Sequence, residues 1–226
     1  REFYIRRIAG LEALDEALGR GTEMGRAVMF IHGLRDMSQI PTIAAINILS
    51  RVARRTADFD ARLRVTNYDP IVMSVSQETV KEAYLEAGRP DAFNPDDVFV
   101  AGTDQFSYAA AVQGIMLRDR PAAHIMMGGF FAESLLFAET GSTTGAIQIA
   151  GTDSYTQLPF FITTCDYTLM GEELYAASAY LSKEPRLLGS LKGQDIGKAV
   201  FLAVLIAGVI LATLDVSFLS QAFKAL

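Results

Sequence analysis

Residues 199–214, with the sequence AVFLAVLIAGVILATL, form an uncharged apolar stretch near the end of the chain. At about 1.5 Å per residue, a helix over this stretch covers roughly 24 Å of a hydrocarbon core that is about 30 Å thick. Apolar residues after Asp215 and the stem of Lys198 can supply the remaining length. We therefore predict a transmembrane helix over residues 198–219. The alternative is a buried core helix of a soluble protein.

Small residues recur along this predicted helix. Ala199, Ala203 and Ala207 lie four residues apart on one helical face, and Gly208 and Ala212 lie on the adjoining face. In lipid, close approach of two backbones across such faces supplies the packing contacts between helices. Besides the lipid bilayer, we expect a second copy of the chain or another membrane subunit as a partner. The alternative is a lone helix that faces lipid.

Basic residues orient the predicted anchor. Four of them precede the apolar stretch, whereas only Lys224 follows it; the four are Lys183, Arg186, Lys192 and Lys198. The positive-inside rule then places the preceding domain in the cytoplasm and the chain in the cell membrane. The single Cys165 agrees with a reducing compartment. A further transmembrane helix before Arg1 is left open.

We expect five segments along the chain. With 226 residues, half of them hydrophobic, the chain is long enough for one well-buried domain and an anchor. The segments are an amphipathic N-terminal segment (1–22), a cytoplasmic α/β domain (23–184), a juxtamembrane linker (185–197), the transmembrane helix (198–219) and a tail (220–226). Within the first segment, residues 8–18 have the spacing of an amphipathic helix that lies either on the membrane or on the domain.

A short apolar run, a polar cluster and a longer helical stretch alternate through the predicted domain. We expect strands at residues 27–31, 63–66, 98–101, 124–127, 146–150 and 159–163, and a last helix at residues 170–181. Apolar runs without strict alternation predict an α/β fold, a mainly parallel sheet with helices on both faces in Rossmann-like or flavodoxin-like layers. The last two strands are too close in sequence for a helical crossover, so they are either antiparallel or separated by an irregular excursion.

Polar residues follow these predicted strands. The carboxyl ends of parallel strands meet at one rim, where α/β proteins bind their ligands. The candidate ligand-binding residues are His32, Asp36, Asp69, Asp104, Gly128, Gly129, Asp153 and Asp166. Several carboxylates on one rim would suit Mg²⁺ or a cationic ligand, although the sequence names no cofactor. The alternative is that these residues are helix caps and turn residues.

Complete catalytic motifs are missing from the sequence. FIHGL at residues 30–34 resembles the His-Gly segment near the oxyanion hole of α/β-hydrolases, but no G-x-S-x-G elbow occurs and His124 begins a strand. The two common phosphate-binding loops and the paired ligands of zinc sites are also missing. A net charge of -6 disfavours a nucleic-acid partner. The sequence therefore favours a protein that is not an enzyme.

Seven strings of residues resemble an uncharacterised family of prokaryotic membrane-anchored α/β proteins, known as a domain of unknown function. They are GRAVMFIHGLRDM (25–37), AAINIL (44–49), NYDPIVM (67–73), EAYLEAGRPDAF (82–93), DQFSYAAAVQGIMLRDRPAA (104–123), CDYTLMGEELYAASAYLS (165–182) and LLGSLKGQD (187–195). The resemblance covers nearly the whole chain. It implies the architecture, a membrane segment after the domain and another before it, but no activity and no site residue.

Two classes of function remain. The favoured one is a structural or assembly subunit of a membrane-associated complex, anchored by the C-terminal helix. The second is a small-ligand, nucleotide or divalent-metal binding domain, with or without enzymatic activity, that uses the polar rim.

Overall fold

The computed structural model describes residues 13–16, 18–19, 23, 25–182 and 185–213. The chain divides into two compact units, Arg1–Ser182 and Lys183–Leu226, which we describe separately. The first unit contains the α/β domain, and the second contains one long helix.

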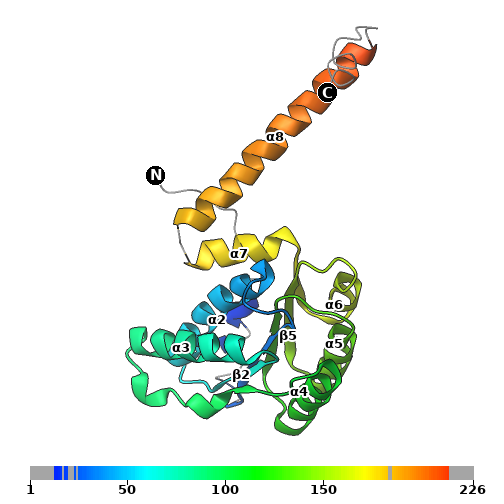
Figure 1. Cartoon of the computed structure of the whole chain (residues 1–226). Coiled ribbons are helices and arrows are strands. Elements are labelled where there is room, and N and C mark those ends of the chain that lie inside the picture. Colours follow the sequence, from blue (N-terminus) through cyan, green and yellow to red (C-terminus); the bar gives the residue numbers. More distant parts are fainter. Residues whose placement is uncertain (1–12, 17, 20–22, 24, 183–184, 214–226) are drawn as a thin grey trace. The chain divides into compact units, whose positions relative to one another are not determined.

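The domain is built on a six-stranded sheet in which every neighbouring pair is parallel (Figure 1). The strands are β1 (Val28–His32), β2 (Leu63–Asn67), β3 (Val98–Val100), β4 (Ala123–Met127), β5 (Ile147–Thr152) and β6 (Tyr167–Met170). Their order is β3-β2-β1-β4-β5-β6, as in doubly wound Rossmann folds. The predicted fold class is therefore confirmed, and the order reverses between β1 and β4.

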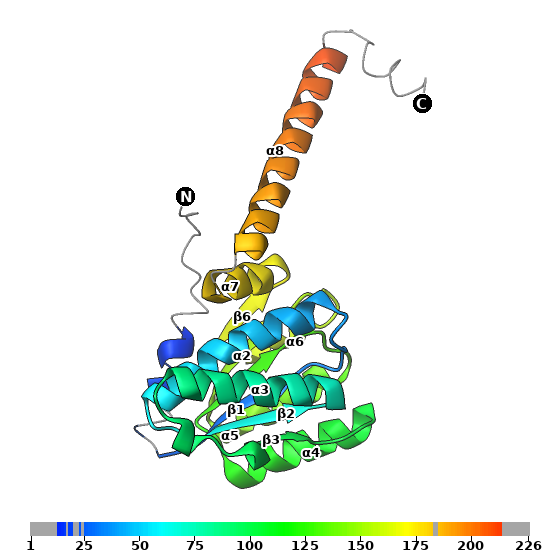
Figure 2. The same cartoon turned by 60° about the vertical axis from the view of Figure 1, so that its left-hand side comes forward.

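Helices cover both faces of this sheet (Figure 2). They are α2 (Ile40–Asp58), α3 (Pro70–Glu86), α4 (Gln105–Asp119), α5 (Glu133–Thr144), α6 (Leu158–Thr164) and α7 (Glu172–Ser182), with two 3₁₀ turns, η1 (Pro90–Ala92) and η2 (Pro95–Asp97). Side chains of α2, α3 and α7 form one apolar core with the sheet, and those of α4, α5 and α6 form the other. Within β1, Phe30 joins the first core and Ile31 the second. Burial on both faces explains why the strands are apolar runs.

The described residues of the N-terminal segment pack on the domain. Ala13, Leu14 and Leu18 are buried in the core that α2 forms with the sheet. Arg55 of α2 donates from Nε to Asp15 Oδ1 at 2.9 Å. Of the two alternatives for this amphipathic helix, the structure supports contact with the domain.

The sixth strand lies later in the sequence than predicted. Residues 159–163 belong to helix α6, and β6 pairs parallel with β5. The aromatic and β-branched residues of this stretch mimic a strand, but Pro159 is in the first turn of α6, where a proline is readily accommodated. The prediction of a strand here was therefore wrong. Both alternatives for the connection between the last two strands, an antiparallel pair or an irregular excursion, were also wrong. The short helix α6 connects β5 to β6, and the two strands are parallel.

The second unit contains α8 (Pro185–Thr213), a continuous helix over residues that we had assigned to the linker and to the membrane segment. Within it, Leu188–Leu211 is long and apolar enough to cross a membrane, and none of it is buried. Ala199, Ala203 and Ala207 are exposed and Gly208 is half-buried, whereas the side chain of Ala212 and residues 214–226 lie outside the described part of the chain.

Candidate functional site

The switch in strand order places the connections after β1 and β4 side by side at the carboxyl edge of the sheet. Gly33 donates its N–H to the carbonyl of Met127 at 3.0 Å, and Leu34 donates to the carbonyl of Gly129 at 2.9 Å. A Cβ on Gly33 would lie 2.4 Å from the Gly129 oxygen, and Gly128 has a φ of +126°. Glycines here allow the two backbones to touch. The glycines at Gly33, Gly128 and Gly129 therefore allow the loop after β1 to pack directly on the loop after β4.

The side chain of Arg35 packs against Gly129. A Cβ on Gly129 would be 2.2 Å from the Arg35 Cδ, so a larger residue there would displace the Arg35 side chain. The guanidinium lies 5.5 Å from the ring centroid of Phe131, and Nη1 donates to Gln39 Oε1 at 3.4 Å. The Nε atom is buried and has no hydrogen-bond partner among the described residues. Arg35 therefore places a positive charge at this edge, against Phe131.

Asp153 lies nearby, after β5. Tyr175 of α7 donates its hydroxyl to Asp153 Oδ2 at 2.8 Å, whereas Oδ1 is buried without a hydrogen-bond partner in the described structure. Burial raises the pKa of Tyr175, the hydrogen bond to Asp153 raises it further, and the charge of Arg35 lowers it. Arg35, Asp153 and Tyr175 therefore share one electrostatic environment at the carboxyl edge.

His32 is part of the core. Its Nε2 is 3.2 Å from the hydroxyl of Ser76, which donates to Asn67 Oδ1 at 3.1 Å. Its backbone carbonyl accepts a 2.7 Å hydrogen bond from Tyr108. Burial lowers the pKa of His32 to about 3, so the imidazole is neutral near pH 7. A buried, neutral imidazole in this position joins β1 to α3 and does not face a substrate.

Three of the candidate aspartates hold turns and helix starts. Asp69 accepts from the N–H groups of the second and third residues of α3, and Asp104 does the same for α4. Asp36 accepts from the backbone and hydroxyl of Ser38. Hydrogen bonds from Ser38 and Ser107 lower the pKa of Asp36 and Asp104, respectively. The carboxylates of all three are already bound to the chain itself.

Asp166 lies at the opposite, amino edge of the sheet. It precedes β6, because the stretch before it is a helix, and its Oδ2 accepts from the N–H of Gln148 at 2.8 Å. The structure therefore does not bring Asp166 together with Asp36 and Asp104. Among the residues that the structure describes, no three His, Cys, Asp or Glu side chains lie close enough to hold a metal ion.

The sequence analysis missed a set of exposed apolar side chains. We call it the apolar rim; its members are Ile40, Ile71, Phe106, Phe131, Tyr155 and Met170. Each lies at one of the six junctions between a strand and the following helix. Phe106 and Tyr155 are both 78% exposed. For Ile40, Ile71 and Phe106 the signal in the sequence was a large apolar residue at the very start of a helix, where polar residues are preferred.

Comparison with protein families places this chain in a family. A family model described as "Domain of unknown function (DUF6754)" matches residues 1–223. No curated protein and no solved structure matches the chain. The function must therefore be argued from the geometry of this chain.

Proposed function

Because the chain belongs to the DUF6754 family, whose description assigns no activity, we propose from its own residues that it is an assembly subunit of a membrane-associated complex. In this proposal α8 anchors the chain in the cell membrane, and the α/β domain lies in the cytoplasm. The excess of lysine and arginine before the apolar stretch supports that orientation. The carboxyl edge of the sheet docks another protein subunit.

The apolar rim is the observation that carries this proposal. Because all six strands are parallel, the six exposed side chains lie at the same edge of the sheet. Single apolar residues on a surface are ordinary, but a set that occupies every junction at one edge is typical of a contact surface. Ile40, Ile71 and Phe106 occupy first turns of helices, where local structure gives no reason for an apolar side chain.

Charge beside the apolar rim defines the partner. Asp36, Asp69 and Asp104 belong to the same junctions as Ile40, Ile71 and Phe106. An apolar surface with negative charge favours a subunit that presents apolar side chains among lysines and arginines. It disfavours an anionic lipid surface and the same edge of a second copy.

The hydrogen bonds of these aspartates also support assembly over catalysis. A general acid or base must reach a substrate with a free carboxyl group. Asp69 and Asp104 instead cap helices, and His32 is buried. The carboxyl edge therefore offers a surface for contact and little reactive chemistry.

A second candidate function is the binding of a small ligand at the switch in strand order. The observation that favours it is the pair of buried atoms, Arg35 Nε and Asp153 Oδ1, without hydrogen-bond partners in the described structure. Buried polar atoms normally have partners. A ligand with an acceptor for Arg35 and a donor for Asp153 would satisfy both. Thermal stabilisation by a nucleotide, which carries both acceptors and donors, would favour this function if it is lost in Asp153→Asn.

The native mass of the full chain, extracted in mild detergent from its own membranes, tests the assembly role. Phe106→Ser with Tyr155→Ser changes two highly exposed side chains, so the fold should persist while the partner subunit is lost. Leu85→Ser with Leu117→Ser is the matched control, because both leucines are exposed but lie late in α3 and α4. We expect the control to keep the wild-type mass. If the Phe106 and Tyr155 variant keeps it too, the docking proposal is wrong.

A further inference from the structure

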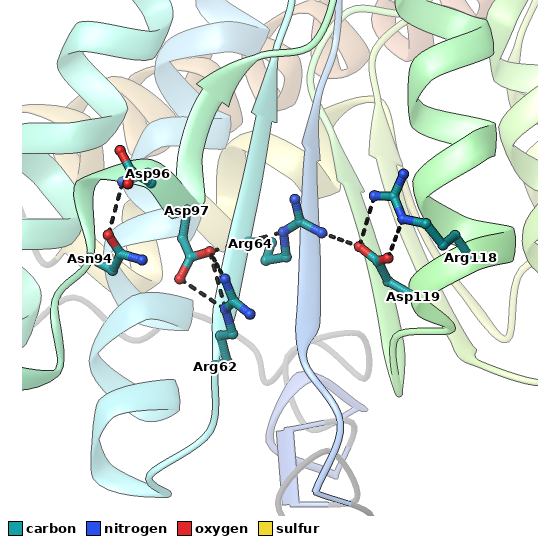
Figure 3. Close-up of polar contacts among 7 residues, drawn as sticks. All are labelled: Arg62, Arg64, Asn94, Asp96, Asp97, Arg118 and Asp119. Carbon is teal, nitrogen blue, oxygen red and sulfur yellow. Dashed lines mark hydrogen bonds and ion pairs between the residues drawn. The ribbon is translucent and has the colours of Figure 1, made fainter.

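The amino edge of the sheet carries an alternating chain of arginines and aspartates, which we call the amino-edge network (Figure 3). Arg62 donates from Nε and Nη2 to Asp97, with N–O distances of 2.6 to 3.1 Å. Arg64 and Arg118 both donate to Asp119. Arg64 Nε lies 4.0 Å from Asp97 Oδ1, so the two halves of the network meet at Arg64.

This network has a surplus of positive charge that faces solvent. Three guanidinium groups meet two carboxylates, and guanidinium groups do not lose their charge in proteins. The side chains of Asp97 and Asp119 are 11% and 25% exposed, whereas those of Arg62 and Arg118 are 62% and 67% exposed. The hydrogen bond from Arg118 lowers the pKa of Asp119, so this carboxylate stays ionised. The outer surface of the network is therefore cationic.

A hollow of about 410 Å³ opens beside the network. Its charged lining residues are Arg26, Asp60, Arg62, Arg64 and Asp119. Asp60 is held by Arg89 at 2.7 Å, and Asp119 is held within the network. Arg26 makes no hydrogen bond or ion pair with the described residues, and it adds a third cation to the lining of the hollow.

We propose that this hollow binds a phosphate-type oxyanion, with Arg26, Arg62 and Arg64 as its donors. The forked guanidinium group matches the oxygens of a phosphate. Arg62 uses Nε and Nη2 for Asp97, which leaves Nη1 for an anion, and Arg64 donates to Asp119 from Nη1, which leaves its Nη2. The volume of the hollow falls within the roughly 300–1,000 Å³ of small-ligand sites.

The network also has a structural role, because it joins β2 to the start of β3 and to the end of α4. A substitution of Arg26 tests anion binding without disturbing this structural role, because Arg26 lines the hollow but is not part of the network. Arg26→Gln therefore removes a cation from the hollow and leaves the ion pairs of β2 intact. The matched control is Arg54→Gln, an exposed arginine of α2 that pairs with Glu86.

A phosphate group reaches this hollow either on a soluble molecule or on a lipid headgroup, and two probes distinguish these sources. The first is inorganic phosphate, added to the full chain in neutral detergent and compared with chloride at equal ionic strength. The second is phosphatidic acid, compared with phosphatidylcholine alone in nanodiscs that hold the full chain. The melting temperature of the α/β domain is the readout for both, because a ligand that binds only the folded state raises it.

We expect at least one probe to raise the melting temperature of the wild type and of Arg54→Gln, and Arg26→Gln to abolish that rise. A response to inorganic phosphate alone assigns a soluble ligand, and a response to phosphatidic acid alone assigns a headgroup. If neither probe acts, or if Arg26→Gln responds as the wild type does, the proposal is overturned. None of these outcomes depends on the partner at the carboxyl edge.

Discussion

The hydroxyl of Tyr175 lies 2.8 Å from Oδ2 of Asp153 and donates a hydrogen bond to it. This contact ties α7 to the connection that follows β5, one of the six junctions at the carboxyl edge. The second oxygen of Asp153, Oδ1, is buried without a hydrogen-bond partner in the described structure. The hydrogen bond from Tyr175 therefore offsets part of the cost of removing this carboxylate from water.

Tyr175→Phe should destabilise the domain by about 1–3 kcal/mol, because it leaves the Asp153 carboxylate without its donor. Chemical denaturation of the full chain, followed by circular dichroism, measures the change. Tyr180→Phe is the matched control, since Tyr180 is an exposed tyrosine of the same helix. Equal stability of the two variants would show that the contact contributes nothing.

Gly33→Ala should destabilise the domain by about 1–3 kcal/mol, because the new Cβ would lie 2.4 Å from the Gly129 oxygen. The opposite change is expected for Gly114→Ala. Gly114 lies within α4 with open space around it, so alanine should stabilise the helix by about 0.5–1 kcal/mol. Melting temperatures of both variants test the pair, and an unharmed Gly33→Ala would contradict the close contact between the loops.

Acid should destabilise the domain through its two buried histidines. Burial lowers the pKa of His32 to about 3 and that of His124 to about 4, below the unfolded value of 6.5. Because the unfolded chain binds these protons first, the free energy of unfolding is highest above pH 6.5 and falls as the pH drops toward 4. Unfolding free energies measured across this range should show a shallower slope for His32→Asn. An unchanged slope would contradict the buried, neutral state of His32.

The alanine face of α8 is expected to contribute contacts within the membrane. Ala203→Leu with Ala207→Leu keeps the helix apolar but should hold a neighbouring backbone away, which reduces the mass of the detergent-extracted complex. Val204→Leu with Val209→Leu is the control, because it adds volume outside that face. A wild-type mass for the alanine variant would assign all assembly to the α/β domain.

The central strands β1 and β4 could be predicted from the sequence because burial on both faces makes each of them a mostly apolar run. The strands β2, β3 and β5 were also placed correctly, from shorter apolar stretches. The sixth strand could not be predicted. Only Leu169 is buried in β6, an edge strand, whereas the neighbouring helix α6 is rich in aromatic and β-branched residues. The same error placed Asp166 at the wrong edge of the sheet. Asp166 would follow a strand at residues 159–163, but it precedes the actual strand β6.

The candidate site was predictable only in part. The polar residues that follow the first five strands lie at the carboxyl edge of the sheet. The sequence does not show whether such a side chain caps a helix or faces a ligand. Asp104 proved to be part of a capping box with Ser107, and its neighbour Phe106 proved to be the exposed side chain. The exposure of Phe106 depends on the packing of α4 against the sheet, which a pattern of residues does not reveal.

Site-specific photocrosslinking tests the docking of a protein subunit at the carboxyl edge most directly. A photoreactive phenylalanine replaces Phe106 of the full chain in its own membranes, and in a parallel sample it replaces Leu117, an exposed residue late in α4. We predict that Phe106 captures one protein subunit that Leu117 does not, and that this subunit presents lysines or arginines beside its point of attachment. The same products from both positions, or lipid adducts alone from Phe106, would contradict the account.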